Sequence, residues 1–264
     1  MFNGVYTAAS GMITQMNRVN NITNNISNVN TPGFKREGIN IKSWSRISGF
    51  SNLKLPLEPD TDKSKGFINE TINSVAHMDK SYIDFSKGPF KRTGNDLDFS
   101  IEGSGFFAVL TPNGVAYTKD GEFSINKDGV LVQRGTGYPV LGENYFKNSK
   151  LIKLTGLKNT IEPDGAVKVD GAKVDTIAIR NFNNYSNLIH NADNTFSTTN
   201  NEQPVVEKNF KLDRGYLETS NVKIVREMVS LIEAQRSFDR YQKVIDALGN
   251  DLASDVIEKI SRVA

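Results

Sequence analysis

The stretch NNITNNISNVNTPGFK, from Asn20 to Lys35, decides how this chain folds. It completes an amphipathic run that starts near Phe2, and it closes with a Thr-Pro-Gly-Phe turn. Adjacent proline and glycine end a helix, so we predict one long helix that stops at this turn. Its apolar residues recur at spacings of three and four, as in the seam along which two coiled-coil helices pack. They are Phe2, Val5, Ala9, Met12, Met16, Val19 and Ile26, with Thr23 in the remaining slot.

Asparagine is the other unusual feature of this helix. Asn17, Asn21, Asn24 and Asn28 recur at helical spacing on a face roughly opposite Val19. Asparagine is a poor helix former, and the six between positions 17 and 28 together cost about 3 to 4 kcal/mol relative to alanine. Two interpretations follow: a polar face exposed to water, or amide groups that bond neighbouring chains.

The carboxy-terminal segment supplies a second helix. Residues 216–264 contain no proline, and Ser220 or Asn221 can cap a helix that starts there. Its apolar residues are Val222, Val225, Val229 and Ile232 in one stripe, followed by Ala234, Phe238, Tyr241, Ile245, Leu248 and Leu252. Because this spacing matches that of the first helix, we predict that the two terminal helices form a coiled-coil layer.

The middle of the chain is typical of β structure. All eight prolines lie between Pro32 and Pro204, so helix breakers spare both ends. Short apolar runs alternate with turn pairs such as Asn113-Gly114 and Asp170-Gly171, which indicate hairpins. A strand is also expected at 138–141, and either an exposed loop or the rim of the β domain at 181–203.

These patterns predict an α+β fold. Residues 1–35 and 216–264 form the terminal-helix domain, 36–85 an extended connector, and 86–215 an antiparallel β-rich domain.

Composition excludes several classes of function. The net charge is only +2, and lysine and arginine are scattered, so neither nucleic acid nor a membrane surface is an expected partner. No apolar run is long enough for membrane insertion, and the amino terminus lacks the pattern of a cleavable signal peptide. The chain has no cysteine, which removes disulfides and thiolate chemistry.

The serious rival is a peptidoglycan-cleaving enzyme of the cell envelope, since a glycosidase needs only two carboxylates. Asp96 and Asp98 are the best pair, because they alternate on an expected strand and so share one face. The two histidines are far apart in sequence, and no metal-ligand or nucleophile motif stands out. We therefore expect no catalytic residues, no cofactor and no metal.

Stretches in three regions of the chain resemble the bacterial flagellar rod and hook proteins. At the amino terminus they are AASGM from Ala8 and NNISNVNTPGFK from Asn24. In the middle they are FKRTGNDLDFSIEGSGFFAVL from Phe90 and AYTKDGEFSINKDGVLVQRGTGYPVLG from Ala116. At the carboxy terminus the stretch is GYLETSNVKIVREMVSLIEAQRSFDRYQKVI from Gly215.

This resemblance implies a structural subunit of the basal-body rod that polymerises into the axial drive shaft across the periplasm. It implies export by the flagellar export apparatus, and partners that are the chain itself and other axial proteins. The proximal-rod type is the closest match, with a distal-rod or hook-type protein as the alternative. We expect an assembly interface that comprises Met12, Met16, Val19, Asn21, Asn24, Asn25, Asn28, Phe34, Gln235, Arg236, Phe238, Tyr241 and Ile245.

Overall fold

The structure, a computed structural model, describes residues 2–43, 76–156, 158–198 and 203–261. The chain divides into two compact units. The helical unit comprises Met1–Ile26, Glu37–Tyr82 and Ile224–Ala264, and the β unit comprises Ser27–Arg36 and Ile83–Lys223. The α+β fold class is confirmed.

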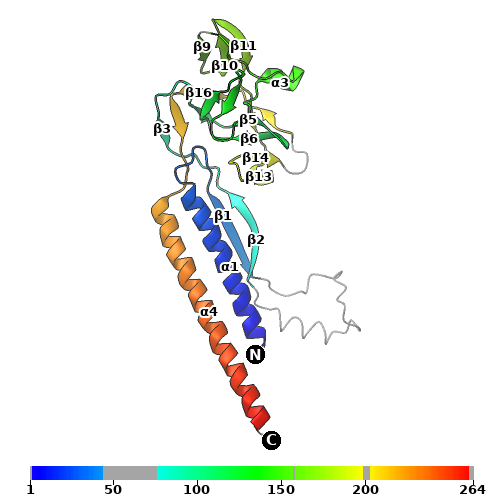
Figure 1. Cartoon of the computed structure of the whole chain (residues 1–264), viewed down its shortest axis with the longest axis vertical. Helices are drawn as coiled ribbons and strands as arrows, with labels where there is room; N and C mark the ends of the chain where they lie inside the picture. The colour runs from blue at the N-terminus through cyan, green and yellow to red at the C-terminus, as the bar shows by residue number, and fades with distance from the viewer. Residues whose placement is uncertain (1, 44–75, 157, 199–202, 262–264) are drawn as a thin grey trace, which may run out of the picture. The chain divides into compact units, whose positions relative to one another are not determined.

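Two long helices and a strand pair make up the helical unit. Helix α1 (Phe2–Ser27) and helix α4 (Ile224–Ser261) lie side by side and run in opposite directions (Figure 1). Strands β1 (Glu37–Ser43) and β2 (Ala76–Ile83) pair as a two-stranded sheet. The described ends of the expected connector are therefore strands, and the rest of it, 44–75, lies outside the described residues.

Small residues decide which face of α1 meets α4. A side chain at Gly11 would come within 2.5 Å of the Tyr241 ring, and one at Gly4 within 3.2 Å of Leu248. Two helices approach closely where one presents glycine, so the contact row runs through Gly4, Ala8 and Gly11. The expected seam through Met12 and Met16 is thus displaced around the helix, and Met16 is 54% exposed.

The α4 contact face agrees with the second part of the expected stripe and differs from the first. Ala234 is fully buried and Tyr241 lies against Gly11, whereas Val225, Val229 and Ile232 are exposed. Neither expected capping residue immediately precedes helix α4, which begins at Ile224 after Lys223. The Ser220 hydroxyl instead accepts a hydrogen bond from the Val222 N–H, before the helix starts.

The β unit consists of short antiparallel strands with one short helix. Its largest sheet has the order β13-β14-β6-β5-β12-β15. Smaller pairings are β11-β10-β9, β16-β4, β17-β3 and β7-β8. The elements are β3 (Phe90–Arg92), β4 (Phe99–Gly103), β5 (Phe106–Thr111), β6 (Gly114–Thr118), β7 (Phe123–Ile125), β8 (Leu131–Gln133), α3 (Glu143–Asn148), β9 (Asn159–Ile161), β10 (Ala166–Val169), β11 (Ala172–Thr176), β12 (Ile179–Asn181), the 3-10 turn η2 (Tyr185–Asn187), β13 (Leu188–His190), β14 (Phe196–Thr198), β15 (Val205–Val206), β16 (Phe210–Arg214) and β17 (Tyr216–Glu218).

Turn chemistry explains the hairpins that the sequence predicted. Between β10 and β11, Asp170 and Gly171 have φ values of 50° and 89°. Two consecutive positive φ values are typical of the two-residue turn that matches the twist of its strands. The hairpin β5-β6 also has a two-residue connection, Pro112-Asn113, but there the positive φ, 116°, belongs to Gly114, which pairs with Thr111 at the start of β6.

One expectation for the β region was wrong. Residues 138–141 form isolated bridges, Val109 with Val140 and Val132 with Pro139, instead of a strand. Of the two alternatives for 181–203, the structure favours the rim of the β domain, because β13 and β14 extend one edge of the main sheet there and Phe196 is fully buried. Its polar composition hid this strand pair.

Aromatic and aliphatic side chains fill the β unit in two clusters. The first includes Phe99, Phe107, Phe123 and Leu131. The second surrounds Phe106 on the other side of the same strands. Because adjacent residues in a strand point to opposite faces, Phe106 and Phe107 serve different clusters. The β unit thus has an apolar core of its own.

Candidate assembly surface

Exposed apolar side chains gather on the paired helices. Val225 is 72% exposed and Ile13 57%, and Met228, Val229 and Ile232 are each about half exposed. Single exposed apolar residues are ordinary, but a group at helical spacing marks an interaction surface. The helices therefore carry more apolar surface than their own pairing covers.

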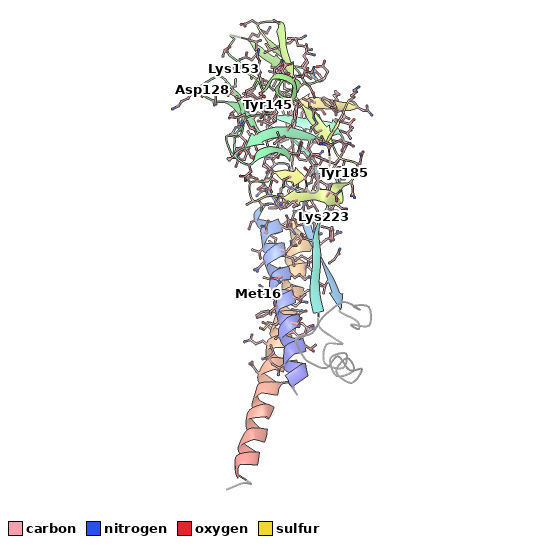
Figure 2. The ribbon with its side chains drawn as sticks, turned by 90° about the vertical axis from the view of Figure 1, so that its right-hand side faces the viewer. Met16, Asp128, Tyr145, Lys153, Tyr185 and Lys223 are labelled. Carbon is pink, nitrogen blue, oxygen red and sulfur yellow. The ribbon has the colours of Figure 1, made fainter. Side chains whose placement is uncertain are left out.

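A shallow groove of about 180 Å³ lies between α1 and α4. Met16 and Val19 line it from α1, and Gln235, Phe238 and Asp239 line it from α4. Figure 2 shows Met16 on the outer side of the helix. Four residues of the expected interface, Met16, Val19, Gln235 and Phe238, are thus brought together.

Asn25 is bonded inside the helical unit. It is fully buried, its side-chain NH2 donates to the Glu37 carbonyl at 2.8 Å, and its side-chain oxygen accepts from the Glu37 N–H at 2.9 Å. One amide therefore satisfies both backbone groups of a residue at the start of β1, as a paired strand would. This use of asparagine was not among the two interpretations of the sequence.

The other asparagines on α1 have different surroundings. Asn20 and Asn24 are exposed and Asn21 is half-buried. The side-chain oxygen of Asn28 accepts a bond from the Thr31 hydroxyl at 3.1 Å, which helps shape the turn after the helix.

The Thr-Pro-Gly-Phe turn packs into the β unit. Phe34 is 1% exposed, and its ring lies 5.4 Å from that of His190. Gly33 has a φ of 69°, and a side chain there would strike the backbone of Lys119 and Asp120. Only glycine combines that conformation with so close an approach. Phe34 is therefore an internal anchor of this chain.

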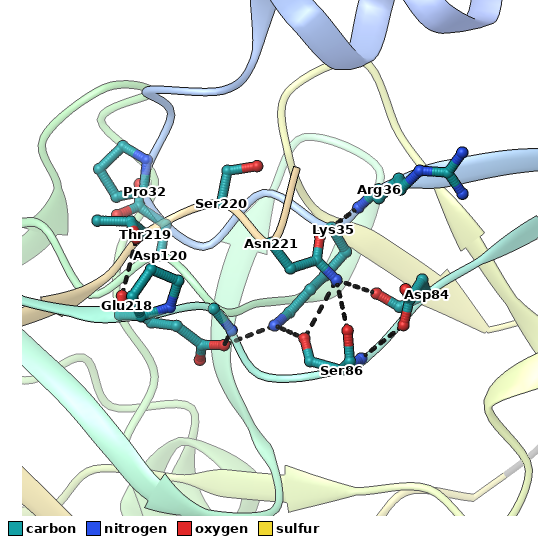
Figure 3. Close-up of polar contacts among 12 residues, drawn as sticks. Pro32, Lys35, Arg36, Asp84, Ser86, Asp120, Glu218, Thr219, Ser220 and Asn221 are labelled. Atoms are coloured by element: carbon teal, nitrogen blue, oxygen red, sulfur yellow. Dashed lines mark hydrogen bonds and ion pairs between the residues drawn. The ribbon is translucent and has the colours of Figure 1, made fainter. Parts of the chain in front are cut away.

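A buried ion pair follows this turn. Lys35 donates to the Glu218 carboxylate at 2.6 Å and to the Ser86 carbonyl at 2.9 Å (Figure 3). The same carboxylate oxygen accepts the Gly88 N–H at 3.0 Å. The Lys35 and Glu218 side chains are 0% and 2% exposed. We call these contacts, with those of Asn221, the polar clasp.

Asn221 completes the polar clasp. Its side-chain oxygen accepts the Arg36 N–H at 2.8 Å, and its NH2 donates to the Asp84 carbonyl at 2.7 Å and to the Ser86 hydroxyl at 3.1 Å (Figure 3). The clasp thus ties together segments near residues 35, 86 and 220.

Burial perturbs two charged groups near the clasp. Burial lowers the pKa of Lys119 to about 8, an effect that the nearby Glu218 partly offsets. Burial likewise raises the pKa of Asp120 to about 6, against hydrogen bonds from Gln133 and Glu122 that lower it. In contrast, the Ser86 N–H lowers the pKa of Asp84. Lys119 and Asp120 are both buried among protein atoms, so we interpret them as structural charges.

The two carboxylates considered for a peptidoglycan-cleaving enzyme, Asp96 and Asp98, interact with different partners. Asp98 is buried and bonds Asn95 and Arg134, while the exposed Asp96 pairs with Arg214. A glycosidase needs two carboxylates that face one open site. These two do not.

Two further findings concern the described part of the chain. Within it, no three histidine, aspartate or glutamate side chains converge as metal ligands. None of its helices combines the length and apolar character that a membrane crossing needs.

The remaining members of the expected interface lie on the paired helices. Met12, Phe238, Tyr241 and Ile245 are half-buried, and Gln235 and Arg236 are exposed. Sequence reasoning missed Lys35, Glu218 and Asn221, although each lies in a motif stretch. One sequence signal could have pointed to these three residues: each is a charged or amide side chain within a short segment rich in turn-forming residues.

Three family models match the chain. The one described as "Flagella basal body rod protein" matches residues 5–35. The one described as "Flagellar hook protein FlgE/F/G D1 domain" matches residues 100–169. The one described as "Flagellar basal body rod FlgEFG protein C-terminal" matches residues 213–254.

Known proteins are similar over nearly the whole length. The flagellar basal-body rod protein FlgF of Caulobacter vibrioides is 30% identical over 263 residues, covering 100% of both chains. The flagellar basal-body rod protein FlgG of Borreliella burgdorferi is 34% identical, covering 96% of this chain and 97% of its own. That of Bacillus subtilis is 30% identical, covering 93% and 94%.

Proposed function

Because the chain belongs to the family of flagellar basal-body rod proteins, we propose that its paired terminal helices are the part through which it polymerises. The protein is a structural subunit of the rod, and the family is not enzymatic. It associates with other axial proteins of the flagellum. The proposal concerns which surface does so.

The observation that carries this proposal is the apolar surface that α1 and α4 leave uncovered. The β unit buries most of its large apolar side chains in two clusters, and those that it exposes, such as Phe90, Phe146 and Ile189, are spread over separate short elements. The helices instead expose Ile13, Met16, Val225 and Val229, each by more than half. Burying one such side chain contributes roughly 1.5 to 3 kcal/mol, so a handful suffices to drive association.

We further propose that neighbouring helix pairs build a continuous coiled-coil layer, the axial drive shaft that transmits torque across the periplasm. The apolar rows with three-four spacing support this. Export through the flagellar export apparatus and a proximal position in the rod belong to the same proposal. They are supported by the family resemblance.

The test compares matched substitutions on the two units. Val225→Asn removes an exposed apolar side chain from α4, and Val205→Asn removes one from β15 in the β unit. Purified full-length protein is followed by analytical ultracentrifugation at rising concentration. We expect Val225→Asn to weaken self-association while Val205→Asn leaves it unchanged. If only Val205→Asn weakened it, the β unit would be the polymerising part and the proposal would fail.

A further inference from the structure

Two separate apolar patches remain on the helical unit. The α4 patch consists of Val225, Met228, Val229 and Ile232, and the α1 patch consists of Ile13 and Met16. Gly11 lies against Tyr241. Because the two helices are antiparallel, moving two residues forward along α1 to Ile13 corresponds to moving two residues back along α4, to residue 239. Ile232 is seven residues from that level, or about 10 Å along the axis. The two patches therefore cannot cover each other within one chain.

The spacings of the two patches match when the helices are antiparallel. Along α1 the positions are Ile13, Met16 and then the exposed Asn20, with steps of three and four. Along α4, read backwards, they are Ile232, Val229 and Val225, again with steps of three and four. Side chains at this spacing on antiparallel helices interlock as knobs into holes.

The charges around the patches also fit. Helix α1 contains no aspartate or glutamate, and Arg18 is its one charged residue. The α4 patch is bordered by the exposed cations Arg226 and Arg236 and by the exposed anion Glu233. An α1 face without charged side chains avoids repulsion from either sign, and the side-chain amide of Asn20 can accept a hydrogen bond from an arginine or donate one to the glutamate.

We propose that the α1 patch of a second copy of this chain covers the α4 patch. The two helices are antiparallel and displaced by seven residues from the register within one chain. Since different surfaces meet, the contact is heterologous, and it repeats from copy to copy as an open polymer. Each step shifts the next copy by roughly 10 Å along the helix axis. This inference rests on the proposed function, that the helices join subunits.

The chain has no cysteine, so an introduced pair reports one contact without background. The test variant carries Ile13→Cys with Ile232→Cys. Within a chain these positions are separated by about 10 Å along the axis, whereas a disulfide needs Cα atoms within about 7 Å. The control variant carries Ile13→Cys with Val244→Cys, which places the second thiol at another exposed position of the same helix. Circular dichroism of the reduced proteins checks that both fold.

Mild oxidation of the assembled protein should give a ladder of disulfide-linked dimers and higher multiples for the test pair, and none for the control. A second pair, Met16→Cys with Val229→Cys, should behave like the first. Polymers that form without this ladder would overturn the proposed register and leave the proposed function standing. If the cysteine-free chain did not self-associate in the ultracentrifuge at any concentration, both the proposed function and this inference would be refuted.

Discussion

Replacing Lys35 with methionine removes the cation of the polar clasp and keeps most of its apolar stem. Glu218 is then an almost fully buried carboxylate that has lost its ion-pair partner and keeps the hydrogen bond from the Gly88 N–H and the more distant charge of Lys119. Removing one partner of a buried ion pair costs about 3 to 5 kcal/mol, because the remaining charge is uncompensated. That loss is a large share of the roughly 5 to 15 kcal/mol by which domains are stable.

The double variant Lys35→Met with Glu218→Leu separates the pair from its surroundings. It removes both charges, so the uncompensated carboxylate disappears. The Gly88 N–H loses its acceptor, at about 1 to 3 kcal/mol if it stays buried, whereas the Ser86 carbonyl keeps the hydrogen bond that the Asn221 NH2 donates. We therefore expect the double variant to be less destabilised than the sum of the two single variants.

The assay is urea denaturation followed by the far-ultraviolet signal of the β unit, for the wild type, both single variants and the double variant. The four free energies of unfolding give the coupling between the two side chains. A loss below about 1 kcal/mol for Lys35→Met would mean that water reaches the site, as at a surface ion pair. Strictly additive losses would likewise refute the clasp.

Four further substitutions probe the helices and the buried acid. Gly11→Leu should separate α1 from α4, because the new side chain would overlap the Tyr241 ring. Gly249→Ala has open space around it and should raise helix stability by about 1 kcal/mol. In thermal melts followed by the helical signal, the first variant should therefore melt at a lower temperature than the wild type and the second at a higher one. Asn25→Ala should cost about 2 kcal/mol despite better helix propensity, since both backbone groups of the half-buried Glu37 lose their hydrogen bonds to this amide, and hydrogen exchange at the start of β1 should accelerate. The pKa of Asp120 rises from 3.8 to about 6 on folding, so its contribution to stability is fully present below pH 3.8 and is lost as the pH rises through 6. Asp120→Asn should remove this part of the pH dependence of stability between pH 4 and 6. If thermal melts of the wild type and the variant showed the same pH dependence, the effect of burial on the Asp120 pKa would be contradicted.

The sequence by itself determined the elements that local chemistry specifies. Continuous three-four spacing without proline predicted α1 and α4, because a helix needs no distant contact to define its repeat. Asp170-Gly171 predicted a hairpin, because two positive φ values suit that dipeptide. The motif stretches likewise indicated the family through the order of their residues alone.

Contacts between distant residues were decided by the tertiary structure alone. The seam of α1 passes through Gly11 instead of Met16, since close approach of the Tyr241 ring outweighs the burial of a methionine. Lys35 and Glu218 are 183 residues apart, and nothing local in either segment marks the other as its partner. Periodicity states which side chains share a face, whereas what covers that face depends on the shape and charge of segments brought together only when the chain is folded.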